Sequence, residues 1–196
     1  MMSARTPVFR QFPRVGIPPH YGTWEIFSNR IEMMMRAGAI EDYTFLWWDV
    51  RPHPKLGTVE TRIFDQQTRV EHTVSLAAMT ICLAHRYASR YDAGEPLVEY
   101  PTELVDDNKV RAAIRGTDGN LIDFRRGEQV PAPEMARELM ELLAPHADEL
   151  GCRAELDGVQ DLLDHGTGAH RQIAICKENE DLRGLVAEMV EKSRPD

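Results

Sequence analysis

Two short stretches of the chain, residues 43–51 and 57–65, alternate between apolar and polar positions with a period of two. A loop containing Pro52, Pro54 and Gly57 joins them, so the pattern predicts a hairpin of two paired strands. Residues 3–22 show no period and are expected to be an extended, irregular lead-in, and 93–101 a linker; a helical period dominates elsewhere. It predicts helices at 24–37, 70–89, 102–116, 154–164 and 168–193, another that begins near Pro133, and a second hairpin at 120–130.

The same pattern indicates which faces of the helices are buried. Thr23 can cap the first helix and Gly38 can end it, and its apolar face contains Trp24, Phe27, Ile31 and Met34. The helix at 70–89 is apolar on most sides, so we expect it to be buried. In the helix after Pro133, the shared apolar side contains Met135, Leu139, Leu142 and Leu150. Helices packed on a small sheet make an α+β fold, and 196 residues suit a single domain, 1–196.

Parity divides the first hairpin into two faces, because successive side chains of a strand point to opposite sides. One face is nearly all apolar and suited to pack against helices such as 70–89; it carries Leu46, Trp48, Val50, Val59, Thr61 and Ile63. The other face gathers Trp47, Asp49, Arg51, Glu60, Arg62 and Phe64. The register stays open, and with it which charges lie opposite each other.

The charged face has two interpretations. The structural one is a solvated sheet face with cross-strand ion pairs, and alternation alone favours it. The functional one is a concave sheet that holds an anionic substrate and a metal. Carboxylates are ligands for Mg²⁺, and the arginine fork fits phosphate or carboxylate oxygens.

Composition narrows the classes of partner. The net charge of −9 and the pI near 5.3 disfavour nucleic acid, because a protein that binds the phosphate backbone needs a basic surface. No apolar run approaches the roughly 18 residues of a membrane span, and the N-terminus has no apolar signal core. The three cysteines form no CxxC pair and the seven histidines show no ligand spacing, which argues against a disulfide scaffold or a zinc site. A cytoplasmic protein with reduced thiols is the expectation.

The stretch FLWWDVRPHPKLGTVETRIFDQQTR, residues 45–69, closely resembles a signature of the glutamate–cysteine ligase type 2 family, the bacterial carboxylate–amine ligases. The matching residues are Trp48 to Pro54, Gly57, Thr58, Val59, Glu60, Arg62, Asp65, Gln67 and Thr68. Three further segments, FPRVGIPP (12–19), DNKVRAAIRG (107–116) and GTGAHRQ (166–172), are similar to other family motifs. Asp107 and Val110 depart from the usual Glu and Trp. The family is in turn related to glutamine synthetase.

The resemblance implies a fold and a reaction. The fold would be a partial antiparallel sheet of the glutamine synthetase and glutamate–cysteine ligase type, packed by helices. The reaction would be an ATP-dependent carbon–nitrogen ligation of the EC 6.3 class. ATP would phosphorylate the carboxylate of glutamate or a similar amino acid, and an amine, whose identity stays open, would displace the phosphate.

Roles for three residues follow by analogy with glutamine synthetase. Glu60 would bind Mg²⁺, Arg62 would bind the transferring phosphoryl group or the substrate carboxylate, and Arg51 would lie near the nucleotide phosphates. Arg51 and Arg62 are therefore the expected catalytic residues, and ATP and Mg²⁺ the expected cofactors. Metal ions and arginines lower the barrier to such a transfer by neutralising charge in place.

Further candidates for substrate or ATP binding are Asp49, Arg14 and a group on the predicted helix 102–116. Arg14 lies on an irregular segment, where it either contacts a ligand or is a surface charge. The helix group contains Asn108, Lys109, Arg111 and Arg115. Arg111 and Arg115 share a face that suits an anion, but we favour a solvated face paired with Asp106 or Asp107. GTGAH predicts a helix-start turn rather than a phosphate loop.

Members of the resembled family are typically longer, and their N-terminal half carries a Gly-x-Glu-Glu-Glu cluster and a His-x-His strand that do not occur here. We therefore expect the C-terminal portion of a ligase, weakly active or inactive alone, or a chain that pairs with a complementary N-terminal chain. A bare sheet edge would also favour a homo-oligomer. The alternative is a non-catalytic module that keeps the fold and binds a metabolite or a partner.

Overall fold

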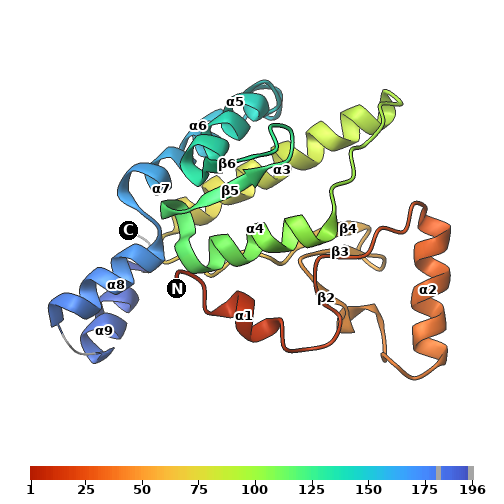
Figure 1. The fold of residues 1–196 in the computed structure, drawn as a ribbon, viewed down its shortest axis with the longest axis horizontal. Helices are drawn as coiled ribbons and strands as arrows, with labels where there is room; N and C mark the ends of the chain where they lie inside the picture. The colour runs from red at the N-terminus through yellow and green to blue at the C-terminus, as the bar shows by residue number, and fades with distance from the viewer. Residues whose placement is uncertain (180–181, 194–196) are drawn as a thin grey trace. The chain divides into compact units, whose positions relative to one another are not determined.

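The structure is a computed structural model that describes residues 1–179 and 182–193 (Figure 1). Its contacts divide the chain into two compact units. Unit 2 is Arg5–Asp65, and unit 1 is Met1–Ala4 together with Gln66–Asp196. Two units that each bury their own core can belong to one catalytic domain, so the prediction of a single domain stays a prediction.

Unit 2 combines two helices with short strands. Its elements are α1 (Arg5–Phe9), β1 (Val15–Gly16), α2 (Trp24–Arg36), the 3-10 turn η1 (Tyr43–Phe45), β2 (Trp47–Trp48), β3 (Val50–His53) and β4 (Thr58–Thr61). β1 pairs with β2 in parallel, and β3 pairs with β4 antiparallel. The core contains Phe27, Ile31, Ile40, Leu46 and Trp48. It packs α2 against β2, the strand that leads into the charged hairpin.

The start and the inner face of α2 follow from the sequence. The Thr23 hydroxyl accepts a hydrogen bond from the Ile26 N–H at 3.2 Å, which satisfies a backbone donor that the first helical turn leaves unpaired. Phe27 and Ile31 are buried, as predicted. Trp24 is exposed, so the prediction that it lies on the buried face is wrong. Its ring contacts the Phe27 ring, with the two ring centroids 5.1 Å apart.

β3 and β4 form the first predicted hairpin, which is confirmed, with both strands shorter than expected. The register pairs Arg51 with Glu60 and therefore settles which charges lie opposite each other. Gly57 closes the turn at a φ of +64°, a conformation that glycine adopts freely, and its N–H donates to the His53 carbonyl at 2.9 Å.

The apolar face of this hairpin differs from the prediction. Val50, Val59 and Ile63 were expected to be packed, yet all three are exposed. Burial in unit 2 centres on Leu46 and Trp48, which precede the hairpin. A two-stranded ribbon of four residues a side offers little area to cover, so the predicted packed face is wrong at these three positions.

Unit 1 consists of helices and one hairpin. Its elements are α3 (Val70–Asp92), α4 (Thr102–Arg115), the 3-10 turn η2 (Gly116–Asp118), β5 (Asn120–Asp123), β6 (Glu128–Pro131), α5 (Ala132–Leu150), α6 (Arg153–Asp157), α7 (Val159–His165), α8 (Gly168–Asn179) and α9 (Leu182–Lys192). α5 and α6 lie along α3 (Figure 1). Between them they enclose a core of Ala78, Cys82, Leu143, Ala147 and Leu156.

The helix predicted at 70–89 is confirmed as α3, but the prediction that it is buried is wrong. Its buried residues are His72, Ser75, Ala78 and Cys82, which share one face, whereas Val74 and Ile81 are exposed. These small and polar side chains let α5 and α6 approach closely. The apolar content of α3 is therefore not a guide to its buried side.

The apolar stripe of α5 is also displaced from the predicted one. Leu143 and Ala147 are fully buried, while Leu142 and Leu150 are exposed. The segment predicted as one helix at 154–164 is two helices, which meet at Gly158. A Cβ at Gly158 would lie 2.4 Å from the Ser75 hydroxyl, so α3 passes too close for any larger residue.

The described residues form three two-stranded sheets and the helices above, which confirms an α+β class. A larger sheet of the glutamine synthetase type stays a prediction. In the described part of the chain, no helix combines the length and apolar character that crossing a membrane requires.

Candidate anion-binding site

Three charged side chains of the β3–β4 hairpin form one cluster. Arg51 lies on β3 opposite Glu60 on β4, and Arg62 follows the end of β4. Arg51 Nη2 donates to Glu60 Oε2 and Arg62 Nη1 donates to Glu60 Oε1, each at 2.5 Å. The predicted gathering of these charges on one face is confirmed, with the carboxylate between the two guanidinium groups.

Arg51 is the most buried member of the cluster, with 5% of its surface exposed. Its Nη1 donates to the carbonyls of Thr44 at 2.6 Å and Leu46 at 3.0 Å. Its buried Nε has no hydrogen-bond partner among the described residues. Arg62 keeps 25% of its side chain exposed, so it is the more accessible of the two arginines.

The electrostatics of the cluster favour the ionised form of Glu60. Burial raises the pKa of the Glu60 carboxyl, but the hydrogen bonds and charges of Arg51 and Arg62 outweigh burial, and the pKa lies below its ordinary value. Two guanidinium groups and one carboxylate leave one net positive charge. Such a surface suits a phosphate or a carboxylate.

Mg²⁺ does not fit this arrangement of side chains. Both Glu60 oxygens already accept hydrogen bonds from arginine, and a cation there would lie beside two positive charges. Mg²⁺ also prefers several oxygen ligands in octahedral geometry. Among the described residues, no group of three potential metal ligands includes Glu60. The role of Glu60 as a metal ligand stays a prediction that requires an arginine to move away.

Arg14 has an unusual backbone. It is the one non-glycine residue with a positive φ, +59°, in the part of the chain that the structure describes. Its carbonyl accepts from the Trp47 N–H at 2.9 Å and its Nε donates to the Phe45 carbonyl at 3.3 Å. A left-handed backbone costs about 1–3 kcal/mol in a residue with a side chain, and it persists where the surroundings fix it. Its predicted ligand contact stays a prediction.

Asp49 joins the strands of unit 2 through its backbone. Its N–H donates to the Gly16 carbonyl at 2.8 Å, and its carbonyl accepts from the Arg62 N–H at 2.7 Å. Asp49 therefore lies beside Arg62, as the prediction that they share a site requires. Its role in substrate or ATP binding stays a prediction.

Arg5 supports the same region and was not singled out from the sequence. Its Nη2 donates to the Arg62 carbonyl at 2.7 Å and its Nη1 to the Ile63 carbonyl at 3.3 Å. Its guanidinium also lies over the Phe9 ring, 4.9 Å from the centroid. No local pattern signals this contact, because it joins positions almost sixty residues apart.

On α4, Asn108 uses its side chain to hold the second hairpin. Its Nδ2 donates to the Ile122 carbonyl at 2.9 Å and its Oδ1 accepts from the Ile122 N–H at 2.7 Å. Both ends of the amide therefore satisfy the backbone of β5. This contact gives Asn108 a structural role, and its predicted ligand contact stays a prediction.

Arg111 of α4 pairs with its own helix and with the second hairpin. Arg111 donates to Asp107 Oδ2 at 2.7 Å and to Gln129 Oε1 at 3.1 Å. Arg115 is exposed, and Lys109 is half-buried. The paired helix face that we favoured over an anion site is confirmed for Arg111. Ligand binding by Lys109, Arg111 and Arg115 stays a prediction.

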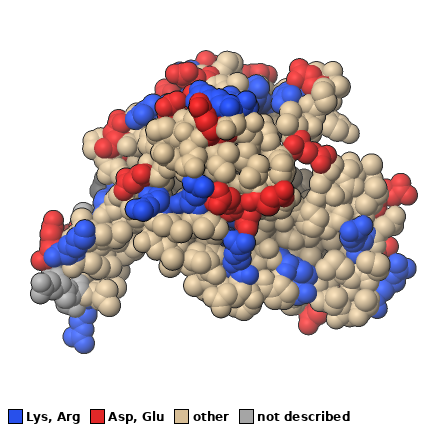
Figure 2. All heavy atoms as spheres, in the orientation of Figure 1, with Lys and Arg blue, Asp and Glu red and all other residues tan. Residues whose placement is uncertain are grey.

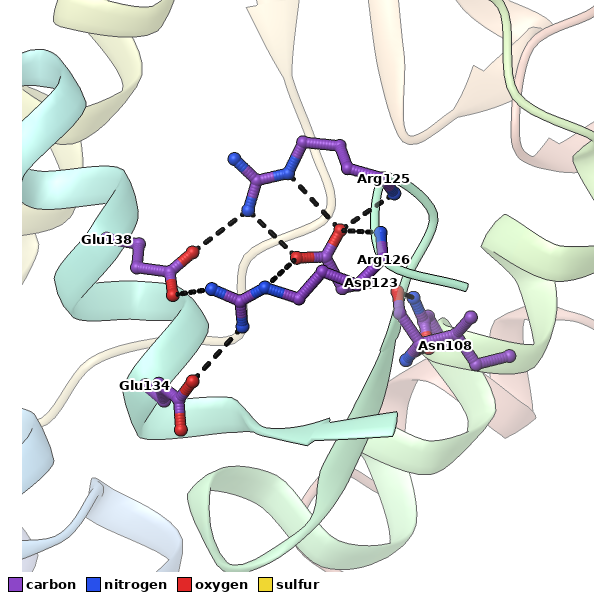
Figure 3. A network of polar contacts seen from close by, with 7 residues as sticks. Asn108, Asp123, Arg125, Arg126, Glu134 and Glu138 are labelled. Carbon is purple, nitrogen blue, oxygen red and sulfur yellow. Dashed lines mark hydrogen bonds and ion pairs between the residues drawn. The ribbon is translucent and has the colours of Figure 1, made fainter. Parts of the chain in front are cut away.

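A larger ion-pair network closes the β5–β6 hairpin onto α5 (Figure 3). The carboxylate of Asp123, 2% exposed, accepts from Arg125 Nη2 at 2.9 Å and from the Arg125 N–H at 2.8 Å. Arg125 and Arg126 then both reach Glu138, and Arg126 also reaches Glu134. Figure 2 shows the result, in which basic and acidic groups intermix over α5 instead of separating by sign. The two arginines are fully paired by the three carboxylates, which leaves one net negative charge, so we assign the network to folding rather than to anion binding.

A polar cluster around the buried His72 in unit 1 contains Arg171 of the GTGAHRQ segment. Arg171 Nη2 lies 3.2 Å from His72 Nδ1, and His72 Nε2 lies 2.7 Å from Asp161 Oδ2. Because arginine can only donate, His72 Nδ1 is the acceptor and its Nε2 carries the proton toward Asp161. The cluster anchors the start of α8 on α3, in agreement with the predicted helix-start turn.

Comparison with known proteins agrees with these motifs. Residues 2–192 match the family model described as "Glutamate-cysteine ligase family 2". A protein of Rubrobacter xylanophilus named "Putative glutamate--cysteine ligase 2-1" is 42% identical over 193 residues, which cover 98% of this chain and 51% of that protein. A Sorangium cellulosum protein named "Putative glutamate--cysteine ligase 2" is 37% identical over 98% of this chain and 52% of its own length.

The chain thus spans about half the length of the curated relatives that it matches. The family match covers both units and each of the segments that carried the resemblance. The chain belongs to the glutamate-cysteine ligase family 2.

Proposed function

We propose that the chain contributes to an ATP-dependent carboxylate–amine ligase that acts on glutamate or a similar amino acid. The γ-phosphoryl group of ATP would pass to the substrate carboxylate, giving an acyl phosphate and ADP. The amine would then attack the acyl carbon, lose a proton and displace phosphate. Family membership and the names of the relatives support the ligase class.

The observation that carries the proposal is the Arg51–Glu60–Arg62 cluster. In it, Arg62 contacts the anion, because it is the more exposed guanidinium and has donors left beyond the one that Glu60 accepts. Glu60 holds Arg62 in place, and Arg51 positions Glu60 from the buried side. Mg²⁺ enters bound to the nucleotide phosphates rather than to a preformed site in this chain.

Binding of ATP is the direct test, measured by isothermal titration calorimetry with and without Mg²⁺. Arg62→Met should weaken ATP binding by about tenfold or more, since a hydrogen bond to a charged group contributes about 1.5–3 kcal/mol. Arg36→Met removes the same charge from an exposed position at the end of α2 in the same unit and should leave binding unchanged. Equal affinity in the unmodified chain and Arg62→Met would refute the assignment.

Glu60→Gln separates two roles for the carboxylate. If Glu60 holds the arginines, the variant should weaken ATP binding equally in the presence and absence of Mg²⁺. If Glu60 is a metal ligand, the variant should remove the increment that Mg²⁺ adds and leave metal-free binding intact. The second result would contradict the positioning role proposed here and restore the metal-ligand role.

A second function, anion binding without phosphoryl transfer, is favoured by one observation. Both oxygens of Glu60 accept hydrogen bonds from arginine, so the cluster is suited to bind an anion without reacting with it. The two functions differ in turnover. Release of phosphate that depends on both ATP and an added amine supports the ligase, whereas ATP binding without release supports the metabolite-binding module.

A further inference from the structure

Two histidines that are far apart in the sequence meet where α3 packs on α5. His85 Nδ1 lies 3.0 Å from His146 Nδ1, and the ring planes meet at 67°. Glu149 lies one turn after His146, with its Oε1 3.7 Å from His85 Nε2. One ligand atom from each of the three residues lies within 4.8 Å of the other two.

The two histidines are held by the best-packed part of unit 1. Cys82, one turn before His85, and Ala147, next to His146, are both fully buried in the α3–α5 core. The rings themselves are half-buried, so a solute can reach them from one side. Ligands carried by packed helices are held more precisely than ligands on loops, which lowers the cost of binding an ion.

The donor set identifies the class of ion. Imidazole nitrogens suit Zn²⁺ and neighbouring transition metals, whereas Mg²⁺ and Ca²⁺ prefer oxygen ligands. Zn–N bonds of about 2.0–2.1 Å place two nitrogens of a tetrahedral site about 3.4 Å apart. The observed 3.0 Å is close to that separation, so the two rings need only a small movement to admit the ion. The Glu149 carboxylate, whose ligand atom lies within 4.8 Å of the other two, must turn toward it.

We propose that His85, His146 and Glu149 bind a divalent transition-metal ion, Zn²⁺, in a three-ligand site that clamps α3 to α5. The fourth position is open to water, as in other sites with three protein ligands. The clamp is separate from the Arg51–Glu60–Arg62 cluster and does not depend on the proposed ligase function. Because the three ligands converge only in the folded chain, Zn²⁺ stabilises the folded state.

The test uses the full chain, stripped of metal with a chelator that is then removed. Titration with Zn²⁺ should give one high-affinity ion per chain, and Zn²⁺ but not Mg²⁺ should raise the melting temperature of unit 1. Co²⁺ in place of Zn²⁺ should give the visible absorption of a tetrahedral site. Absence of Zn²⁺ binding in the unmodified chain would overturn the proposal.

Substitutions of the proposed ligands test whether these residues bind the ion. His85→Gln and Glu149→Gln should each weaken Zn²⁺ binding by about tenfold or more, because each removes a ligand. His20→Gln, an exposed histidine of unit 2, is the matched control and should bind Zn²⁺ as the unmodified chain does. Glu149 has 69% of its side chain exposed, so its variant folds even if His85→Gln does not. Unchanged affinity in Glu149→Gln would place the ion elsewhere and refute the clamp.

Discussion

Replacing Arg51 by methionine should destabilise unit 2 strongly. Methionine replaces the apolar stem of arginine but can donate none of the hydrogen bonds that the guanidinium makes. The variant loses the contacts with the Thr44 carbonyl at 2.6 Å, the Leu46 carbonyl at 3.0 Å and Glu60 at 2.5 Å. Two main-chain carbonyls and one carboxylate lose a donor together.

The size of the effect follows from burial. Breaking a buried ion pair typically costs about 3–5 kcal/mol, and an unsatisfied buried acceptor costs about 1–3 kcal/mol. Two features of the cluster reduce the total expected loss in the free energy of unfolding. Glu60 is 37% exposed, so water replaces part of its lost pairing, and the unpartnered Nε of Arg51 is removed with the charge. We expect Arg51→Met to lower the free energy of unfolding of unit 2 by about 3 kcal/mol.

Tryptophan fluorescence reports this unit selectively. The three tryptophans of the chain, Trp24, Trp47 and Trp48, all lie in unit 2. A urea titration followed by fluorescence therefore gives the unfolding of unit 2, and the midpoint together with the slope gives the free energy. Far-UV circular dichroism, which the helices of unit 1 dominate, provides the parallel signal.

Arg62→Met is the matched control, because it removes the same charge from the same cluster. Arg62 is partly exposed and its guanidinium pairs with the partly exposed Glu60, so the loss in the free energy of unfolding should be about 1 kcal/mol or less. Equal destabilisation by the two variants would refute the argument that burial and the two carbonyl contacts make Arg51 a structural anchor. A loss below about 1 kcal/mol in Arg51→Met would refute it as well.

Three further predictions concern unit 1. The hydrogen bonds of Arg125 lower the pKa of Asp123 from 3.8 to about 2. The ionised Asp123 therefore contributes fully to stability above about pH 4, and this contribution is lost as the pH falls toward 2. Asp123→Asn should flatten the pH dependence of the urea midpoint between these two pH values. Leu143→Ala should lower the free energy of unfolding by about 2–5 kcal/mol, because Leu143 is fully buried. Burial, and then the neighbouring Cys152 thiol, raise the pKa of Cys82 to about 11, so at pH 8 a thiol reagent should modify Cys82 last.

Each of these has a control within the chain. Leu142→Ala, next to Leu143 but exposed, should cost less than about 1 kcal/mol, and an equal cost would contradict the packing described. For Cys82, peptide mapping after partial labelling identifies the modified thiol, and early labelling of Cys82 would show that the helices open at that point. If the urea midpoint of Asp123→Asn still falls steeply with decreasing pH, the acid sensitivity belongs to another carboxylate.

Local sequence patterns were sufficient to predict the features that depend only on residues close together in the chain. The period of two and the Pro and Gly residues predicted the β3–β4 hairpin, and parity placed Arg51, Glu60 and Arg62 on one face, because both depend only on neighbours along a strand. The Thr23 cap was predicted for the same reason. Which strand positions lie opposite each other was beyond these patterns, since register depends on how two strands are joined and packed.

The sequence by itself determined most of the long helices, both antiparallel hairpins, the α+β class, the charged face and the family motifs of this protein. Only the tertiary structure decided that Arg51 is buried against two carbonyls, that Val50 is exposed and that His85 meets His146. Burial and contact between distant positions are properties of packing, which depends on which faces of two helices or strands meet in space. The hydrophobic period of a helix reveals its apolar side. Which side is buried depends on where the neighbouring helices or strands pack against it.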